Sequence, residues 1–179
     1  MKRKKILEII EIPEGINAEI SGDVLRIRKD SNELKRRLNY NVRIEGKKII
    51  TECENPTKKD KKKIKSDSAH IKNMISGLNK KYIYKLQICS VHFPMNLSVR
   101  EGDVVIKNFL GEVKERKARI LPDVEVKIEK DIITVESSNK EGAGQTAANI
   151  ENATRVRKRD RRIFQDGVFI TEKEKGARK

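Results

Sequence analysis

The chain has 179 residues, of which 36% are hydrophobic and 39% are charged, and its formal net charge at pH 7 is +15. This length suits either one domain or two small ones, and the basic balance favours a polyanionic partner, either nucleic acid or an anionic membrane surface. No apolar run reaches the roughly 18 residues of a membrane span, and the N-terminal segment MKRKKILEIIEIPEG lacks the apolar stretch and cleavage site of a secretory signal. We therefore expect a soluble, cytoplasmic protein.

The first half of the chain predicts short strands followed by one helix. Residues 24–28, with the sequence VLRIR, alternate apolar and polar side chains as half-buried strands do. The pairs Ser21-Gly22 and Glu45-Gly46 are typical of turns. The helix is predicted by apolar residues at helical spacing and by Gly77 near its expected end. Those apolar residues are Ile64, Ile71, Met74, Ile75 and Leu78.

The second half repeats this order. Residues 108–120, NFLGEVKERKARI, predict a hairpin that turns at Gly111, and residues 124–128 alternate like a strand. A second helix is predicted by a slimmer apolar face formed by Ala143, Ala147, Ile150, Ala153 and Val156. Between the halves, residues 82–88, YIYKLQI, resemble a strand rather than a flexible linker.

The two halves also share sequence. IPEGINAEISGDVLRIRKD, from Ile12, aligns with FPMNLSVREGDVVIKNFL, from Phe93, and VRIEGKKIITE, from Val42, aligns with VKIEKDIITVE, from Val126. A repeat of this length is a copied domain rather than a solenoid unit. In each copy, one apolar helix face and several half-apolar strands must cover each other. We therefore predict an α+β fold of two tandem homologous domains, residues 1–82 and 83–179, each a small antiparallel sheet packed on one helix.

Most of the basic charge lies in five segments. They contain 24 Lys and Arg but only four acids, for a net charge of +20, so the rest of the chain sums to −5. A single basic run is usually a solvated face, but five runs on a slightly acidic background favour phosphate binding with steep salt dependence. The five segments are residues 2–5, 58–65, 114–119, 155–162 and 173–179.

Three segments of the chain resemble one protein family, and they occur in that family's order and spacing. They are SAHIKNMISGLNKKYIYKLQICSVHFP, KNFLGEVKERKARI and AANIENATRVRKRDRRIFQDGVFITEK. The family is the sixth protein of the large ribosomal subunit in its archaeal and eukaryotic form, which is the ninth in eukaryotic naming. The resemblance covers nearly the whole chain.

This resemblance implies two tandem copies of a sheet-plus-helix domain that bind large-subunit rRNA and support translation. It implies a location near the stalk base and the factor-binding region, close to the sarcin-ricin loop. The implied partners are the rRNA, neighbouring large-subunit and stalk-base ribosomal proteins, and translation factors.

Two segments depart from the family's usual pattern. Bacterial members end their second domain with a glycine-rich segment of the PEYVRGKGIRY type, where this chain has RKRDRRIFQDGVF. The turn at residues 77–82 is also more basic than the glycine-rich turn usual there. Contact positions of bacterial members are therefore not transferred to this chain.

Four of the basic segments supply the candidate RNA contacts. The run after the second helix ranks first because arginine binds phosphate bidentately and stacks on exposed bases, although one or two of its arginines are expected to complement the helix dipole instead. The hairpin arm after Gly111 ranks second. The lysine-rich start of the first helix opposes the helix dipole, so either phosphate offsets its charge or it is a solvated face. The basic tail has the composition of an extension that orders on RNA.

The candidate residues follow these segments. Those of the run are Arg155, Arg157, Lys158, Arg159, Arg161 and Arg162, and those of the arm are Lys114, Arg116, Lys117 and Arg119. The helix start contributes Lys58, Lys59, Lys62 and Lys63, and the tail contributes Lys173, Lys175, Arg178 and Lys179. Because aromatic residues make up only 4% of the chain, we expect recognition of RNA shape and phosphate, with little reading of bases.

The sequence leaves two other classes of function to consider. An enzyme is disfavoured because His70 and His92 have no triad or metal partners at a suitable spacing, no phosphate loop is present, and Cys53 and Cys89 fit as small core residues. We therefore expect no catalytic residue, metal, cofactor or small-molecule substrate. A free RNA chaperone or a membrane-surface binder differs from a ribosomal protein in that it would not co-sediment with large subunits.

Overall fold

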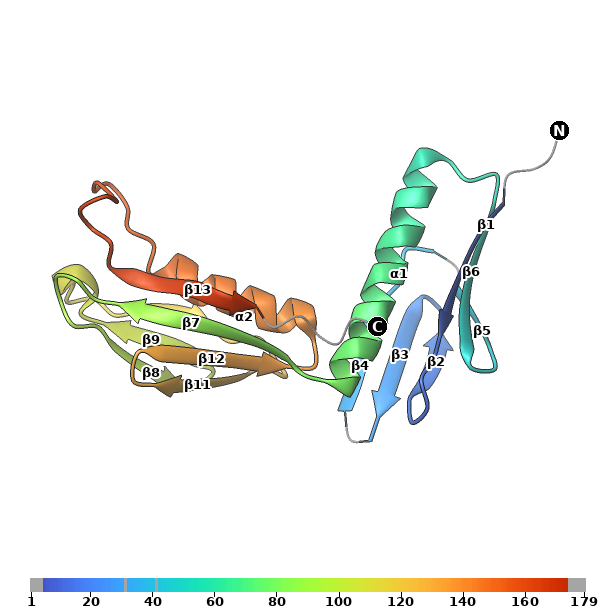
Figure 1. Ribbon diagram of the computed structural model, residues 1–179, viewed down its shortest axis with the longest axis horizontal. Coiled ribbons are helices and arrows are strands. Elements are labelled where there is room, and N and C mark those ends of the chain that lie inside the picture. Colours follow the sequence, from blue (N-terminus) through green and yellow to red (C-terminus); the bar gives the residue numbers. More distant parts are fainter. Residues whose placement is uncertain (1–4, 31, 41, 174–179) are drawn as a thin grey trace. The chain divides into compact units, whose positions relative to one another are not determined.

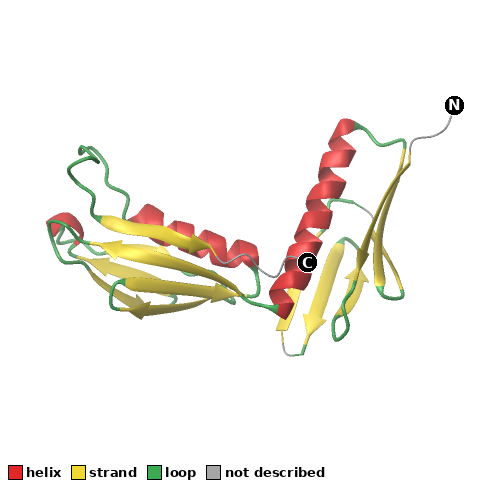
Figure 2. Cartoon of the chain, viewed as in Figure 1, coloured by secondary structure: helices red, strands yellow, loops and turns green. Residues whose placement is uncertain are grey.

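The structure is a computed structural model that describes residues 5–30, 32–40 and 42–173. By their internal contacts the residues divide into two compact units, Met1–Lys80 and Lys81–Lys179. Each unit consists of antiparallel strands and one α-helix (Figures 1 and 2). The predicted α+β class with two tandem domains is confirmed. The division at residues 82 and 83 stays a prediction about where the domains separate.

The first unit contains two three-stranded sheets and one helix. The strand orders are β1-β6-β5 and β2-β3-β4, and every neighbouring pair is antiparallel. Helix α1 (Lys58–Asn79) packs against β1 and β3, one strand from each sheet. The strands are β1 (Lys5–Glu11), β2 (Asn17–Ser21), β3 (Val24–Lys29), β4 (Asn32–Arg37), β5 (Val42–Glu45) and β6 (Lys48–Glu54).

The core of the first unit follows from the alternation of its strands. Ile27 in β3 and Ile49 in β6 are fully buried, and they belong to one apolar cluster with Ile71 and Ile75 of α1. These helix residues lie one turn apart on the same side of α1, as their spacing predicts. The helix therefore covers an apolar face contributed by both sheets.

The second unit contains a three-stranded sheet, β10-β9-β8, and a four-stranded sheet, β11-β12-β7-β13. Helix α2 (Lys140–Ala153) packs against β7, β10, β12 and β13. A short 3-10 helix, η1 (Phe109–Gly111), follows β9. The strands are β7 (Tyr82–Cys89), β8 (Asn96–Arg100), β9 (Asp103–Lys107), β10 (Arg116–Arg119), β11 (Glu125–Glu129), β12 (Ile132–Ser137) and β13 (Gly167–Lys173).

The two units share one topology. The order β7-β12-β11 repeats β1-β6-β5, and β8-β9-β10 repeats β2-β3-β4. The matching turns contain Gly22 and Gly102, whose φ angles of +59° and +82° are in the left-handed region that favours glycine. Strand β13 pairs with the outer side of β7, whereas no described strand pairs with the outer side of β1 (Figure 1).

The structure differs from the sequence-based expectation in three respects. Each unit has two small sheets instead of one, because alternation of side chains predicts strands but not their partners. Helix α2 ends at Ala153, so Val156 lies beyond it. Strand β13 was not predicted, although Val168 and Ile170 alternate with Phe169 at the spacing of a strand.

Candidate nucleic-acid interface

The basic run Arg155–Arg162 lies in the loop between α2 and β13. All six of its Lys and Arg side chains are exposed, and none forms an ion pair with a residue in the described part of the chain. Asp160 orders the middle of the loop, because its carboxylate accepts from the Arg162 amide at 2.9 Å and its carbonyl accepts from the Phe164 amide at 2.9 Å. The loop therefore presents a cluster of exposed cations, none of which forms an ion pair with a described residue.

Two buried polar side chains form hydrogen bonds at the two ends of this loop. At its start, the Thr154 hydroxyl donates to a carbonyl in the last turn of α2 at 3.1 Å and accepts from the Val168 amide at 2.9 Å. At its end, Asp166 is only 1% exposed and accepts from the amides of Val91 and His92 at 2.8 and 2.9 Å. Sequence reasoning missed both anchors, because an isolated Thr or Asp carries no sign of burial.

Asp166 also contacts the side chain of His92. The His92 Nδ1 atom lies 2.6 Å from Asp166 Oδ2. Burial alone would raise the pKa of the Asp166 carboxyl, but the hydrogen bonds from His92 and Val91 outweigh burial and lower that pKa from 3.8 to about 2. Asp166 is therefore ionised at neutral pH, and it joins the segment after β7 to the base of the basic loop.

An aromatic side chain lies within the same loop. The Phe164 ring stacks with the His92 ring, with their centroids 4.9 Å apart and an angle of 24° between their planes. The guanidinium of Arg159 lies 4.8 Å from the Phe164 ring centre, at a distance typical of a cation–π interaction. No role was predicted for these two rings from the sequence.

The second candidate segment lies on β10 and just before it. Strand β10 pairs with β9 in antiparallel register. The first arm of this hairpin is therefore β9, which ends before residue 108, and Phe109–Gly111 form η1, so the hairpin predicted within residues 108–120 was wrong in its first arm. Lys114, Lys117 and Arg119 are exposed, and their side chains form no ion pair with a residue that the structure describes. These three residues therefore have the same exposed, unpaired character as the run.

Arg116, in the same arm, differs from these three residues because its side chain forms contacts within the chain. Its guanidinium donates to both carboxylate oxygens of Glu112, at 2.8 and 2.6 Å, and to the Ala153 carbonyl at 2.8 Å. It also lies 4.2 Å from the centre of the Phe109 ring. The hydrogen bond from Arg116 lowers the pKa of Glu112. Arg116 thus joins the arm to the C-terminus of α2, where cations are favoured, a role that the sequence analysis gave to arginines of the run.

The lysine-rich helix start lies in the first unit. Lys58, Lys59, Lys62 and Lys63 are all exposed on the first turns of α1. Thr57 caps this helix in a capping box: its hydroxyl accepts from the Asp60 amide at 3.3 Å, and Asp60 accepts from the Thr57 amide at 3.0 Å. Asp60 therefore supplies one negative charge in the first turn, against six lysines in residues 58–65, and a phosphate contact of these lysines stays a prediction.

The remaining candidates belong to the tail. Lys173 is exposed at the end of β13, opposite Tyr84, whereas Gly167 at the start of β13 pairs with Cys89. Because a strand rises about 3.3 Å per residue, β13 separates Lys173 from the run by roughly 20 Å. The structure thus does not bring Lys173 to the run. Lys175, Arg178 and Lys179 lie outside the described residues.

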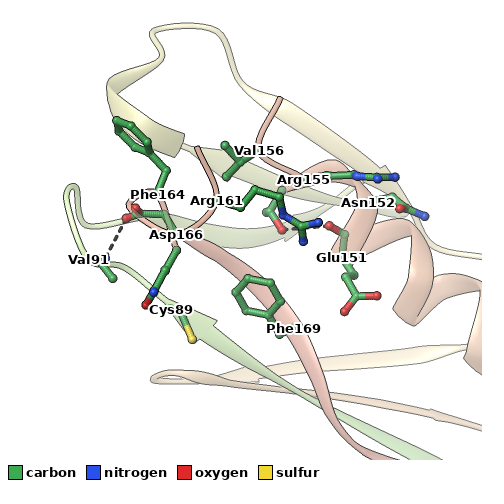
Figure 3. A pocket seen from close by; sticks show the side chains of 12 residues that line it. Cys89, Val91, Glu151, Asn152, Arg155, Val156, Arg161, Phe164, Asp166 and Phe169 are labelled. Atoms are coloured by element: carbon green, nitrogen blue, oxygen red, sulfur yellow. Dashed lines mark hydrogen bonds between the residues drawn. The ribbon is translucent and has the colours of Figure 1, made fainter. Parts of the chain in front are cut away.

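A cavity of about 840 Å³ opens beside the basic loop (Figure 3). It lies where the end of α2, the loop, the end of β7 and the start of β13 meet. Cys53 is buried as expected, but Cys89 is only partly buried and lines this cavity, so the expectation that Cys89 is a core residue was wrong. The lining residues are Cys89, Val91, Glu151, Asn152, Thr154, Arg155, Val156, Arg161, Phe164, Gln165, Asp166 and Phe169.

Membrane spans and metal sites are two further features that bear on function in residues 5–30, 32–40 and 42–173. Neither helix in these ranges is long and apolar enough to cross a membrane. The same ranges contain no group of three or more His, Cys, Asp or Glu side chains placed to hold a metal ion.

Comparison with known proteins places the chain in a family. Residues 93–167, which include the arm, the run and most of the residues that line the cavity, match the family of ribosomal protein L6. The chain is 40% identical over 171 residues to the large ribosomal subunit protein uL6 of Methanococcus vannielii, covering 94% of both chains. It is also 40% identical over 177 residues to the protein of that name from Methanocella arvoryzae, covering 97% of this chain and 99% of the relative.

The fold and the site define a basic α+β protein of two tandem sheet-and-helix units with an exposed, unpaired cationic loop. The chain belongs to the ribosomal protein L6 family, in its archaeal form. The resemblance carried by the three sequence segments is therefore confirmed.

Proposed function

We propose that this chain is a structural constituent of the large ribosomal subunit that binds large-subunit rRNA. Its relatives are named as large ribosomal subunit proteins, and the family consists of structural proteins rather than enzymes. The observation that carries the proposal is the loop Arg155–Arg162, whose six exposed cations have no ion-pair partner among the described residues. Lys114, Lys117 and Arg119 add to it, because Arg116 holds the arm against the end of α2 beside the loop.

The physical basis of this binding is electrostatic. Each phosphate that is neutralised by Lys or Arg releases condensed counterions, so affinity falls steeply as salt rises. Arginine adds a planar fork that binds phosphate bidentately. Because hydrogen bonds of Thr154 and Asp166 hold both ends of the loop, its backbone is partly ordered before binding, which lowers the entropy that the backbone loses on association.

We also propose a location and a set of partners for the chain. By its family, it lies in the cytoplasm as part of the large subunit, near the stalk base and the sarcin-ricin loop. Its expected neighbours are large-subunit and stalk-base ribosomal proteins and translation factors. Lys58, Lys59, Lys62 and Lys63 are exposed and form a second candidate contact with rRNA in the first unit.

The loop is tested by replacing Arg157, Arg159 and Arg161 together by Ala and measuring the affinity for large-subunit rRNA at several salt concentrations. We expect weaker binding, and a slope of log affinity against log salt that is smaller by about 2 to 3, because each lost phosphate contact removes roughly 0.7 to 0.9 from the slope.

The matched control replaces three exposed lysines that lie outside the basic segments, Lys48, Lys72 and Lys127, by Ala. This control removes the same charge from the chain. If it weakens binding and lowers the slope as much as the loop variant does, net charge rather than the loop explains the affinity, and the assignment of the loop is wrong.

A further inference from the structure

We propose that the cavity beside the basic loop receives one unpaired base of the rRNA, which stacks on the ring of Phe169. This inference rests on the proposed function and names the kind of nucleotide that its site takes. It revises the expectation, drawn from the low aromatic content, that the protein reads few bases. The cavity brings an accessible aromatic ring, hydrogen-bonding groups and unpaired arginines together at one place.

The first observation is that the Phe169 side chain is accessible to solvent. The residue is 38% exposed, although it is an aromatic residue in the interior of strand β13. A Cβ atom at position 167 would lie 3.1 Å from the Phe169 ring and 3.4 Å from the Thr154 carbonyl, which are tight contacts. The ring therefore lies close to Gly167, and its exposed part lines the cavity.

The other aromatic ring in the lining is already engaged. Phe164 stacks with His92 at 4.9 Å and with the Arg159 guanidinium at 4.8 Å. These contacts belong to the structure that supports the loop. Phe169 has no ring contact with a residue in the described part of the chain, so it is the aromatic surface that remains for a ligand.

The second observation is the polar lining around that ring. Figure 3 shows Arg161 and Glu151 extending into the space beside Phe169. Glu151 Oε1 accepts from the Ile170 amide at 3.2 Å, which orients the carboxylate and leaves its second oxygen as an acceptor. Arg161 has no ion-pair partner among the described residues. A base edge carries both donors and acceptors, and these two side chains offer the complementary groups.

The shape of the site selects an unpaired nucleotide. A base inside a duplex is stacked on both faces and shows only its edges, so it cannot place a face on a ring within a recess. A base that is splayed out of the helix can, and stacking on an aromatic side chain tolerates any base. The cavity volume of about 840 Å³ is sufficient for such a group. The cations of the run would then bind the phosphates on either side of this unpaired nucleotide.

The test uses the full chain and deproteinised large-subunit rRNA. Phe169→Leu keeps an apolar side chain but removes the ring, and we expect it to weaken rRNA binding about 10-fold. The matched control is Phe93→Leu, because Phe93 is 46% exposed in the same unit but does not line the cavity. The control is expected to bind as the unchanged protein does, and thermal unfolding of both variants checks that they fold.

A second measurement does not depend on any variant. The unchanged protein bound to the rRNA is irradiated at 254 nm, and the cross-linked peptide and nucleotide are identified. We expect a cross-link from Phe169 or Cys89 to a nucleotide that is unpaired in the rRNA. The inference is overturned if both Phe variants bind as the unchanged protein does, or if the cavity residues cross-link to a paired nucleotide, to a protein segment or to nothing.

These outcomes separate the inference from the proposed function. If the unchanged protein binds rRNA with steep salt dependence but the cavity results are negative, the loop binds phosphate and the base site does not exist. If the unchanged protein does not bind rRNA at all, the proposed function fails and the base site fails with it.

Discussion

At the residue scale, Asp166 determines how the candidate interface is held together. Its buried carboxylate accepts from two backbone amides and lies 2.6 Å from the His92 ring. Hydrogen bonds to an ionised group are stronger than neutral ones, and a buried carboxylate without them would be unstable. The loop Arg155–Arg162 therefore depends on an acidic residue outside the basic run.

We predict that Asp166→Asn lowers the free energy of unfolding by about 2 kcal/mol at pH 7, because an uncharged amide makes weaker hydrogen bonds with the same amides and with His92. The measurement is urea unfolding of the full chain. Asp131→Asn is the control, since Asp131 is exposed in the same unit, and its effect should stay within about 0.5 kcal/mol.

The same residue predicts a dependence on pH. The pKa of Asp166 is lowered to about 2 in the folded protein from an ordinary value of 3.8. Its contribution to stability is therefore complete above pH 3.8 and is lost as the pH falls through about 2. Asp166→Asn should lose less stability over this range than the unchanged protein, and identical acid-unfolding profiles for the two would contradict this role.

Residue type predicted the exposed cations but not the residues that support them. Lys and Arg are seldom buried, so the residue types of the dense run Arg155–Arg162 predict that it lies at the surface. Thr154, Asp166 and His92 are single polar residues whose partners lie up to 75 positions away in the sequence. Their pairing exists only in the folded chain, so no pattern in the sequence predicts it. The assignment of a phosphate role to the run stays a proposal.

At the element scale, periodicity predicted the helices better than the sheets. Ile64, Ile71, Ile75 and Leu78 marked one face of α1, and all four are buried. Helix α2 ends at Ala153, before Val156, and the side chain of its C-cap residue Thr154 donates to a carbonyl of the last turn. Strand β13 was not predicted, and nothing local in its sequence shows that it would pair with β7.

Arg116 links two elements, and this role leads to a testable contrast with its neighbour. We predict that Arg116→Met lowers the free energy of unfolding by about 1 kcal/mol, because it removes the contacts with Glu112, Ala153 and the Phe109 ring. Lys117→Met removes the same charge from an exposed side chain and should change stability by less than about 0.5 kcal/mol.

The affinity for rRNA should show the opposite order: at low temperature, where both variants are folded, Lys117→Met should weaken binding more than Arg116→Met does. Lys117→Met is expected to weaken binding directly, since its ammonium is exposed and unpaired among the described residues. Equal loss of stability in the two variants would show that Arg116 does not hold β10 against α2.

At the scale of the whole molecule, the distribution of charge matters more than its total. The five basic segments hold a net +20 while the rest of the chain sums to −5. Within the acidic remainder, many cations are paired, as Arg28 and Lys35 are with Glu33. The cations of the run and of the helix start are exposed and unpaired among the described residues. This division separates residues that stabilise the fold from those available to a polyanion.

The central claim, that the exposed loop attaches this chain to the large subunit, is tested most directly by sedimentation. The unchanged chain and the variant with Arg157, Arg159 and Arg161 replaced by Ala are each assembled into ribosomes and centrifuged through gradients of rising salt. We predict that the unchanged chain sediments with large subunits at high magnesium and that the variant is released at lower salt. Recovery of the unchanged chain only in the light fractions, or release of both at the same salt concentration, would contradict the account.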